Sequence, residues 1–163
     1  MSQETAREEE IVNKTKACFP EFIKETKIDR TLRVEMTLDK DHILEIAKWI
    51  VHELGLDHLK GIAGVDYPTR KKIEVLYFLG SFSKPEIRDI IVTLKAELPR
   101  DNPSIASMVS IWPSAHFHER ETFEMFGVKF EEHPDLRRLL TLDNWEGPPP
   151  LLKDIKFPEM GQR

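Results

Sequence analysis

The sequence predicts an α+β fold in which helices and a mixed β-sheet form a two-layer sandwich. Apolar residues recur at helical spacing in some segments and alternate with polar residues in others, in the order helix, two strands, helix, three strands. A C-terminal helix and an extended proline-rich tail follow. The 163 residues, 40% of them hydrophobic, suffice for one core and are too few for a second full domain. This pattern leaves the strand order open.

The chain begins with an expected helix followed by a hairpin. The helix covers about residues 5–18 and is stopped by Pro20, which has no backbone N–H to continue the helical hydrogen bonds. Residues 32–37 alternate in polarity as a half-buried strand does, and a weaker strand precedes them at 22–28. Residues 29–30 are the expected turn between these two strands.

A second helix and three further strands complete the expected body. Asp39 suits the N-cap of this helix, its apolar residues recur at helical spacing up to Leu54, and Gly55 suits the position after its end. Strands are expected at about residues 59–66, 73–82 and 87–98, the middle one almost continuously apolar, as in the interior of a sheet. The helices are expected to cover one face of this sheet.

A charged helix follows the sheet. Residues 102–104 are expected to form a short turn or helix, and Pro113 opens a helix that runs to about Phe126. On one side of this helix Arg120 and Glu124 have the spacing of an i,i+4 ion pair. Another side carries one carboxylate among apolar residues: Trp112, Ala115, Glu119, Phe123 and Phe126. The simplest interpretation is an amphipathic surface helix with ordinary charge pairs.

The segment 127–163 is expected to be an extended tail. It holds five of the eleven prolines, so we expect little regular structure beyond a helical turn at about residues 135–140. It also holds several leucines and Trp145, which a disordered tail would lack. Because a proline-stiffened chain loses little entropy on ordering, we expect the tail to wrap a partner subunit. The chain is therefore divided into a body, residues 1–126, and this tail.

Charge and cysteine content exclude several functions. With 29 acidic and 24 basic residues and a formal net charge of -5, the chain lacks the basic excess typical of nucleic-acid binding. Cys18 is its only cysteine, so the four thiolates of an iron–sulfur cluster cannot come from this chain. No apolar stretch has the length of a membrane span, and the acidic N-terminus shows no targeting segment. The expected compartment is the cytoplasm.

Three other interpretations stay open at this point. The residue types of a hydrolytic zinc site occur at His116, His118, Glu119, His133 and Asp135. However, positions two apart on a helix point to different sides, and the His-Glu-x-x-His spacing is missing. Cys18 is more typical of a small core residue than of a nucleophile. The third interpretation is a free-standing binding or assembly module whose tail covers its own sheet.

Four segments between Pro103 and Asp154 carry a specific combination of motifs. They are Trp-Pro-Ser-Ala-His-Phe-His-Glu-Arg-Glu-Thr-Phe-Glu-Met-Phe-Gly-Val at 112–128, His-Pro-Asp-Leu-Arg-Arg-Leu-Leu at 133–140, Trp-Glu-Gly at 145–147 and Lys-Asp at 153–154. This combination, at this spacing, closely resembles the 30 kDa subunit family of NADH:quinone oxidoreductase (complex I). The same subunit type recurs in membrane-bound hydrogenases, sulfur-reducing relatives and reduced-deazaflavin dehydrogenases.

The resemblance implies a structural and assembly subunit that binds no cofactor and performs no catalysis itself. It implies a place in the peripheral arm of a membrane-bound complex, on the cytoplasmic side of the cell membrane, with membrane contact only through the complex. The implied partners are a hydrogenase-like large subunit, an iron–sulfur small subunit and other complex I-like subunits. Iron–sulfur clusters, and nickel–iron in hydrogenase relatives, would belong to these partners.

By matching position, the resemblance also assigns interface residues. They are Glu119, Arg120, Glu121, His133, Asp135, Arg137, Arg138, Trp145, Lys153 and Asp154. A buried Arg–carboxylate pair at such an interface gives geometric specificity. The chain departs from the family pattern mildly at Phe117, Glu124 and Glu132, and more strongly at 147–154, where it has one extra residue and a Leu in place of an Arg. The last departure favours a relative with a different electron donor or acceptor.

Overall fold

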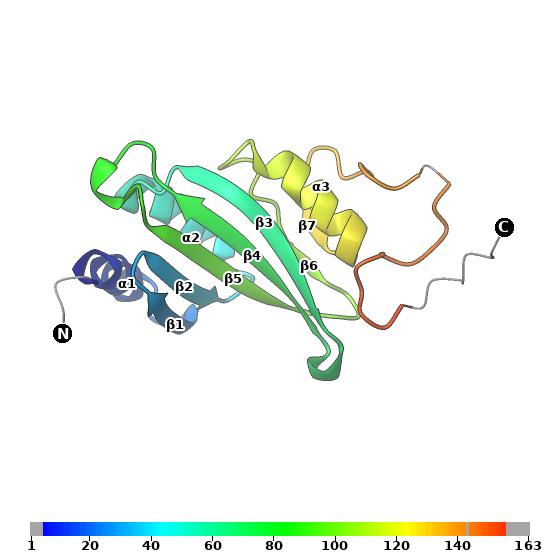
Figure 1. Ribbon diagram of the computed structural model, residues 1–163, viewed down its shortest axis with the longest axis horizontal. Coiled ribbons are helices and arrows are strands. Elements are labelled where there is room, and N and C mark those ends of the chain that lie inside the picture. Colours follow the sequence, from blue (N-terminus) through cyan, green and yellow to red (C-terminus); the bar gives the residue numbers. More distant parts are fainter. Residues whose placement is uncertain (1–4, 143, 156–163) are drawn as a thin grey trace.

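The computed structural model of the chain describes residues 5–142 and 144–155. Five strands form one mixed sheet in the order β1-β2-β5-β4-β3, and two short strands, β6 and β7, form a small parallel sheet of their own (Figure 1). β2 and β5 are parallel, and the other neighbours in the large sheet are antiparallel. The predicted α+β class with a mixed sheet is therefore confirmed, and the structure supplies the strand order that the sequence pattern left open.

Helix α1, Ala6–Cys18, and the hairpin of β1, Ile23–Arg30, and β2, Arg33–Leu38, form the first unit. The helix has the expected extent, but the turn predicted at residues 29–30 is wrong, because pairing continues to the Arg30–Arg33 register. Leu32 occupies the turn with a φ of 68°. Its backbone N–H donates to the buried carboxylate of Glu8 over 2.7 Å, so a contact with α1 fixes the turn.

The second helix, α2, covers Ile43–Trp49 and continues as a π-helical turn, Ile50–Leu54. The predicted N-cap at Asp39 is wrong, because Asp39 instead accepts the N–H of Asp41 over 2.9 Å and shapes a turn before the helix. Gly55 ends the helix with a φ of 69°, as expected for a residue in the left-handed conformation.

The remaining strands are β3, His58–Tyr67, β4, Lys72–Gly80, and β5, Ile91–Pro99, with short 3₁₀ turns at Pro68–Arg70 and Pro85–Ile87. β4 is an interior strand, as its apolar sequence indicated. The strand predicted at 87–98 begins four residues later than expected, at Ile91, because the end of the 3₁₀ turn and a further turn after it occupy residues 87–90.

Helix α3 covers Ala115–Phe126, between β6, Ser104–Ala106, and β7, Lys129–Glu131. The sequence did not predict this short parallel pair, because its partners are three residues long and a whole helix separates them. The helical turn expected at 135–140 is also absent from the described residues, where this segment is irregular.

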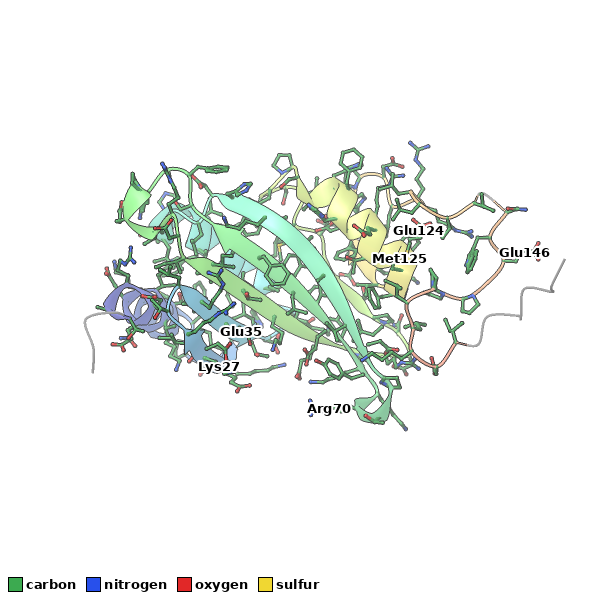
Figure 2. All side chains as sticks on the ribbon, viewed as in Figure 1. Lys27, Glu35, Arg70, Glu124, Met125 and Glu146 are labelled. Carbon is green, nitrogen blue, oxygen red and sulfur yellow. The ribbon has the colours of Figure 1, made fainter. Side chains whose placement is uncertain are left out.

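One hydrophobic core unites the body. The inward residues of β2, β4 and β5 pack with apolar residues of α1 and α2, including the fully buried Ile43, Ile46 and Ile50. The opposite face of the sheet carries cross-strand ion pairs, such as Lys95 with Glu35 at 3.3 Å (Figure 2). Helices therefore cover one face of the sheet, and the other face stays polar.

Helix α3 packs beside strand β3, and Gly64 allows the approach (Figure 1). A Cβ atom at Gly64 would lie 2.5 Å from the Phe126 ring, closer than packed atoms approach. At Gly61, on the same strand, a Cβ atom would meet nothing within 4 Å. Of the two glycines, only Gly64 is needed for the packing of α3 against β3.

We expect Gly64→Ala to lower the free energy of unfolding by about 1–3 kcal/mol, because the Phe126 ring must move out of its place between helix and strand. The matched control, Gly61→Ala, should leave it unchanged or raise it by up to about 1 kcal/mol. Urea unfolding followed by circular dichroism measures both values. Equal effects of the two substitutions would contradict this account of the packing.

Candidate functional site

Three charged side chains of α3 are buried, which is unusual for a surface helix. Glu119 is fully buried, and Arg120 and Glu124 are 7% and 6% exposed. A buried charge is costly unless hydrogen bonds satisfy it. The contacts of these three residues therefore show what the helix is built to hold.

Arg120 binds backbone rather than a carboxylate. Its Nε donates to the carbonyl oxygen of Arg137 over 2.9 Å, and its Nη2 donates to that of Arg138 over 2.8 Å. The ion pair that its spacing with Glu124 suggested does not occur among the described residues. The guanidinium group instead fixes two consecutive carbonyl groups of the tail backbone to the helix.

Glu124 continues the same attachment one helical turn further on (Figure 2). Its Oε2 accepts the backbone N–H groups of Leu139 and Leu140, each over 2.8 Å, and its Oε1 accepts that of Thr141. Desolvation alone would raise the pKa of Glu124, but the hydrogen bonds from 139–141 outweigh it and lower the pKa to about 2. Arg120 and Glu124 together hold the carbonyl and N–H groups of residues 137–141, which we call the stapled loop.

Glu119 points the other way, toward the segment before the helix. It accepts the hydroxyl of Ser107 and the N–H of Met108, both over 2.6 Å. Burial raises the pKa of Glu119 to about 7, because these two hydrogen bonds do not offset the loss of solvent. The ring of His133 lies close by, with its Nε2 4.0 Å from Oε2 of Glu119.

His133 is held by backbone groups in its neutral form. Its Nε2 lies 3.1 Å from the carbonyl oxygen of His116, and its Nδ1 accepts the N–H of Asp135 over 3.0 Å. This pattern assigns the proton to Nε2, and burial lowers the pKa of His133. Asp135 in turn pairs with the exposed side chain of Arg137, at 2.8 Å.

The rest of the tail returns to the body. The N–H of Leu151 donates to the carbonyl of Met125 over 3.0 Å, and the N–H of Lys153 donates to Asp66 over 2.9 Å. Arg100 bridges Asp66, at 2.7 Å, and Asp154. The described part of the tail therefore returns to its own body at Leu151, Lys153 and Asp154.

The structure brings most of the ten predicted interface residues together and separates the others. Six surround α3: Glu119, Arg120, His133, Asp135, Arg137 and Arg138. Arg138 donates to the carbonyl of Trp145 over 2.6 Å, so that residue lies beside the group. Lys153 and Asp154 instead lie at the Asp66–Arg100 pair.

The predicted interface residues also differ in burial and in what they contact. Glu119 and Arg120 are buried and hold backbone, whereas Glu121 and Arg137 are exposed. Sequence reasoning missed Glu124 as a site residue, although its place one turn after Arg120 was visible. It also missed Asp66 and Arg100, because no local pattern links them to the tail.

An apolar surface adjoins the stapled loop. Leu140 and Leu142 are 60% and 73% exposed, Leu139 is 41% exposed, and Phe117 and Leu151 are more than half exposed. We call Leu139, Leu140 and Leu142 the apolar strip. Exposed apolar side chains that gather in one segment are typical of an interaction site.

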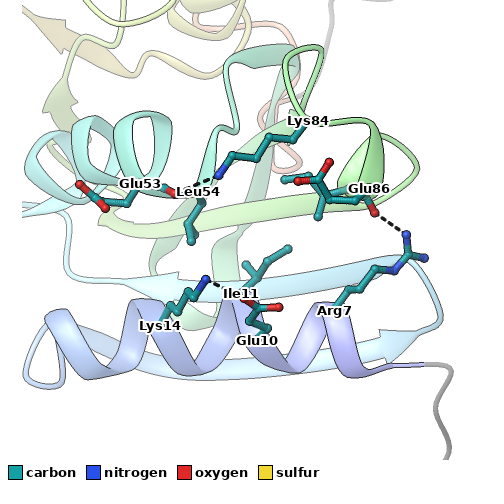
Figure 3. A pocket seen from close by; sticks show the side chains of 9 residues that line it. Arg7, Glu10, Ile11, Lys14, Glu53, Leu54, Lys84 and Glu86 are labelled. Atoms are coloured by element: carbon teal, nitrogen blue, oxygen red, sulfur yellow. Dashed lines mark hydrogen bonds and ion pairs between the residues drawn. The ribbon is translucent and has the colours of Figure 1, made fainter.

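A separate cavity of about 240 Å³ lies between α1 and the end of α2 (Figure 3). Its cations already have partners, since Lys14 pairs with Glu10 at 2.6 Å and Lys84 donates to the carbonyl of Glu53 over 3.1 Å. Arg7 likewise donates to the carbonyl of Glu86. These contacts leave the cavity poorly suited to an anionic ligand.

The zinc interpretation gains no support. Among the residues that the structure describes, no group of three His, Cys, Asp or Glu side chains could hold a metal ion. Cys18 is exposed at the end of α1, so its predicted place in the core is wrong. In the described parts of the chain, no helix has the length and hydropathy needed to cross a membrane.

These observations define a class of protein: a small α+β domain in which buried charges of one helix hold the backbone of a C-terminal segment. The sequence from residue 36 to 160 matches the model of the family described as respiratory-chain NADH dehydrogenase, 30 Kd subunit. The chain belongs to this family, which confirms the resemblance carried by the sequence motifs.

Relatives in this family come from several complexes. The chain is 40% identical over 146 residues to a subunit of the F(420)H(2) dehydrogenase of Methanosarcina mazei, covering 89% of this chain and 90% of the relative. It is also 40% identical over 118 residues to a subunit of the NADH-quinone oxidoreductase of Roseiflexus sp. strain RS-1, covering 71% of this chain and 65% of the relative.

Two solved structures share the fold. A chain of the membrane-bound sulfane sulfur reductase, an archaeal respiratory membrane complex, has a TM-score of 0.79 and 26% identity over 92% of this chain and 86% of its own length. The trypsin-resistant fragment of Nqo5 has a TM-score of 0.66 and 25% identity, covering 80% of this chain and 99% of the fragment.

We expect Glu124→Gln to loosen the stapled loop, because an amide NH₂ group would face at least one backbone N–H that the carboxylate now accepts. An unsatisfied group of this kind costs about 1–3 kcal/mol. Hydrogen exchange at the amides of 139–141 should accelerate. The control is Glu121→Gln, three residues away and exposed, which should leave that exchange unchanged; equal acceleration in both variants would contradict the assignment.

Glu119 should give stability a pH dependence. Its folded pKa lies above the ordinary 4.5, so its contribution is full below about pH 4.5 and is lost as pH rises through about 7. The free energy of unfolding of Glu119→Gln, minus that of the original chain, should therefore rise by about 3 kcal/mol between pH 4 and pH 8. This value follows from about 1.4 kcal/mol per pKa unit.

Urea unfolding across this pH range measures the difference between the two chains. Glu124→Gln is the control, because the lowered pKa of Glu124 stabilises the fold above about pH 4.5 and this contribution is lost only as pH falls through about 2. Parallel curves for Glu119→Gln and the original chain would show that Glu119 keeps its ordinary pKa.

Proposed function

We propose that this chain is a structural and assembly subunit of the peripheral arm of a membrane-bound complex I-like oxidoreductase. It docks on a hydrogenase-like large subunit and supports electron transfer that its neighbours carry out and couple to ion translocation. The observation that carries this proposal is the stapled loop. Arg120 and Glu124 hold its backbone, so Leu139, Leu140 and the following Leu142 face outward in a fixed arrangement.

The energetics favour a docked state for this surface. Burying an exposed leucine side chain contributes about 1.5–3 kcal/mol, and the strip offers several large apolar side chains. Because hydrogen bonds already order the loop backbone, docking would require little further loss of conformational entropy. The strip therefore has the properties of an interface core.

The exposed charges would supply specificity around that core. Glu121 and Arg137 are exposed, and Arg137 keeps Asp135 as its neighbour at 2.8 Å. Charges at an interface rim direct association and orientation more than they add affinity. Glu119, Arg120 and His133 would act indirectly, by holding the backbone that carries the rim.

The tail would contribute its outer side to the interface. Its residues up to Ile155 contact their own body through Met125 and Asp66, so a partner would meet the tail as part of a preformed surface. The division into a body of residues 1–126 and a partner-wrapping tail of 127–163 remains a prediction, and residues 156–163 lie outside the described residues.

Membership of the family supports a proposal for the partners and the location. We infer an iron–sulfur small subunit and other complex I-like subunits as neighbours, with the chain itself peripheral on the cytoplasmic side of the membrane. Iron–sulfur clusters, and nickel–iron if the complex is a hydrogenase, would belong to those neighbours. The relatives belong to dehydrogenase, NADH-quinone oxidoreductase and sulfane sulfur reductase complexes, so the electron donor and acceptor are set elsewhere.

A free-standing binding module is the second candidate. One observation favours it: the tail returns to its own body through Leu151 and Lys153, as a self-contained module would require. This return covers α3 and the end of β3 rather than the open face of the sheet. The apolar strip also stays exposed, which fits the module less well than the docked subunit.

Affinity purification of the chain from native membranes in mild detergent tests the proposal. Mass spectrometry of the companions, with iron and nickel assays, should find a large subunit, a cluster-bearing subunit and membrane subunits. Nickel would identify a hydrogenase among the relatives. Recovery of the chain alone, without metal and fully soluble, would favour the free-standing module.

We expect the double variant Leu140→Glu, Leu142→Glu to reduce recovery of the companions at least tenfold, because docking would bury two unpaired carboxylates. Phe82→Glu is the control, since Phe82 is 64% exposed in the connection between β4 and β5, which Figure 1 shows at the opposite end from the tail. Equal recovery from both variants would remove the strip from the interface.

A further inference from the structure

A groove of about 220 Å³ lies along the contact between β3 and α3, on the side of the helix away from the stapled loop contacts. Its lining includes Ile62, Ala63 and Gly64 from the strand, Glu121 and Met125 from the helix, and Leu151 from the tail. Figure 2 labels Met125 on the helix. Because glycine has no side chain, Gly64 contributes backbone atoms to the groove wall, so the wall includes main chain of β3.

β3 is an edge strand. It pairs with β4 on one side, and within residues 5–142 and 144–155 no strand pairs with its other side. An edge strand presents a row of N–H and C=O groups that another extended chain can pair with. The backbone in the groove wall belongs to this row.

The two edges of the sheet differ in how they are protected. The opposite edge strand, β1, carries charged residues along its length: Lys24, Glu25, Lys27, Asp29 and Arg30. Such charges prevent unwanted strand pairing. β3 has none between Gly61 and Val65, and its small side chains there allow another backbone to come close. The edge at β3 is thus suited to pairing and the edge at β1 is not.

The α3 side of the groove carries a negative charge, which favours an occupant with a positive one. Phe117, Glu121 and Met125 lie at i,i+4 steps and form one stripe along α3. Glu121 is the one charged residue in the groove lining, and among the described residues it has no hydrogen-bond or ion-pair partner. An occupant that matches this site carries a basic side chain among apolar ones.

We propose that this groove accepts an extended segment of a neighbouring subunit, which pairs with β3 as a sixth strand and places a Lys or Arg side chain against Glu121. An apolar side chain of the segment fills the space between Ile62 and Met125. This inference rests on the proposed function, because it assumes that the chain sits in a complex. It adds a second contact, separate from the apolar strip and lined in part by Leu151.

A second copy of this chain suits the groove less well. Two copies that paired through β3 would each offer the uncharged stretch from Gly61 to Val65, which has no cation for Glu121. Both Glu121 carboxylates would then lie close to apolar surface without a partner, at a cost in free energy. The site therefore fits a different subunit with a basic extended segment.

Photo-crosslinking in the intact complex tests the inference. A benzophenone amino acid replaces Ile62 in one sample and Lys27, on the β1 edge, in the matched control, and both complexes are purified from native membranes. We expect the probe at Ile62 to link to one peptide of another subunit that contains a Lys or Arg, and the probe at Lys27 not to reach that peptide.

Charge variants give a second readout. Glu121→Lys should lower the yield of the Ile62 crosslink at least tenfold, whereas Glu45→Lys, at an exposed position of α2, should leave it unchanged. Circular dichroism of both variants checks that each is folded.

The outcomes separate this inference from the proposed function. If companions copurify but the probe at Ile62 links only within this chain or to a second copy, the strand-accepting groove is wrong and the assembly role stands. If Glu121→Lys leaves the crosslink unchanged, the basic partner is wrong. If no companions copurify at all, both proposals fail together.

Discussion

The hydrogen bonds from Arg120 and Glu124 to the backbone of residues 137–141 organise the C-terminal part of the molecule. The guanidinium group donates to carbonyl groups, and the carboxylate accepts from N–H groups one helical turn later. The backbone of the loop supplies hydrogen-bond partners for both buried charges. In return, the charges supply partners for N–H and C=O groups that an irregular loop would otherwise leave unpaired. A loop without secondary structure is thereby held in one conformation on α3.

Two glutamates on the same helix show how desolvation and hydrogen bonding together set the pKa of a buried acid. Glu124 accepts three backbone N–H groups and its pKa falls to about 2, whereas Glu119 accepts two donors and its pKa rises to about 7. Both acids are buried, so desolvation acts on each. Helix α3 therefore holds one acid that favours its ionised form and one that favours its neutral form.

This inner framework supports two outward surfaces. The apolar strip includes Leu139 and Leu140 of the stapled loop, and the groove beside β3 exposes an unprotected strand edge next to Glu121. Leu151 lines the groove, where its N–H donates to the carbonyl of Met125. In the C-terminal part of the molecule, three charges of α3 are directed inward and the leucines of the apolar strip are exposed, and exposed apolar surface of this kind is typical of an interaction site.

The sequence by itself determined the α+β class, the extent of α1 and α3, and the family, because local periodicity sets helices and strands and the motifs at 112–154 are specific. It did not determine that Arg120 and Glu124 bind backbone instead of each other, nor that Asp66 receives the tail. Those contacts join residues 15 to 87 positions apart, so only the tertiary structure decided them. The turn predicted at residues 29–30 was wrong for the same reason, because a carboxylate of α1 fixes the turn at Leu32 instead.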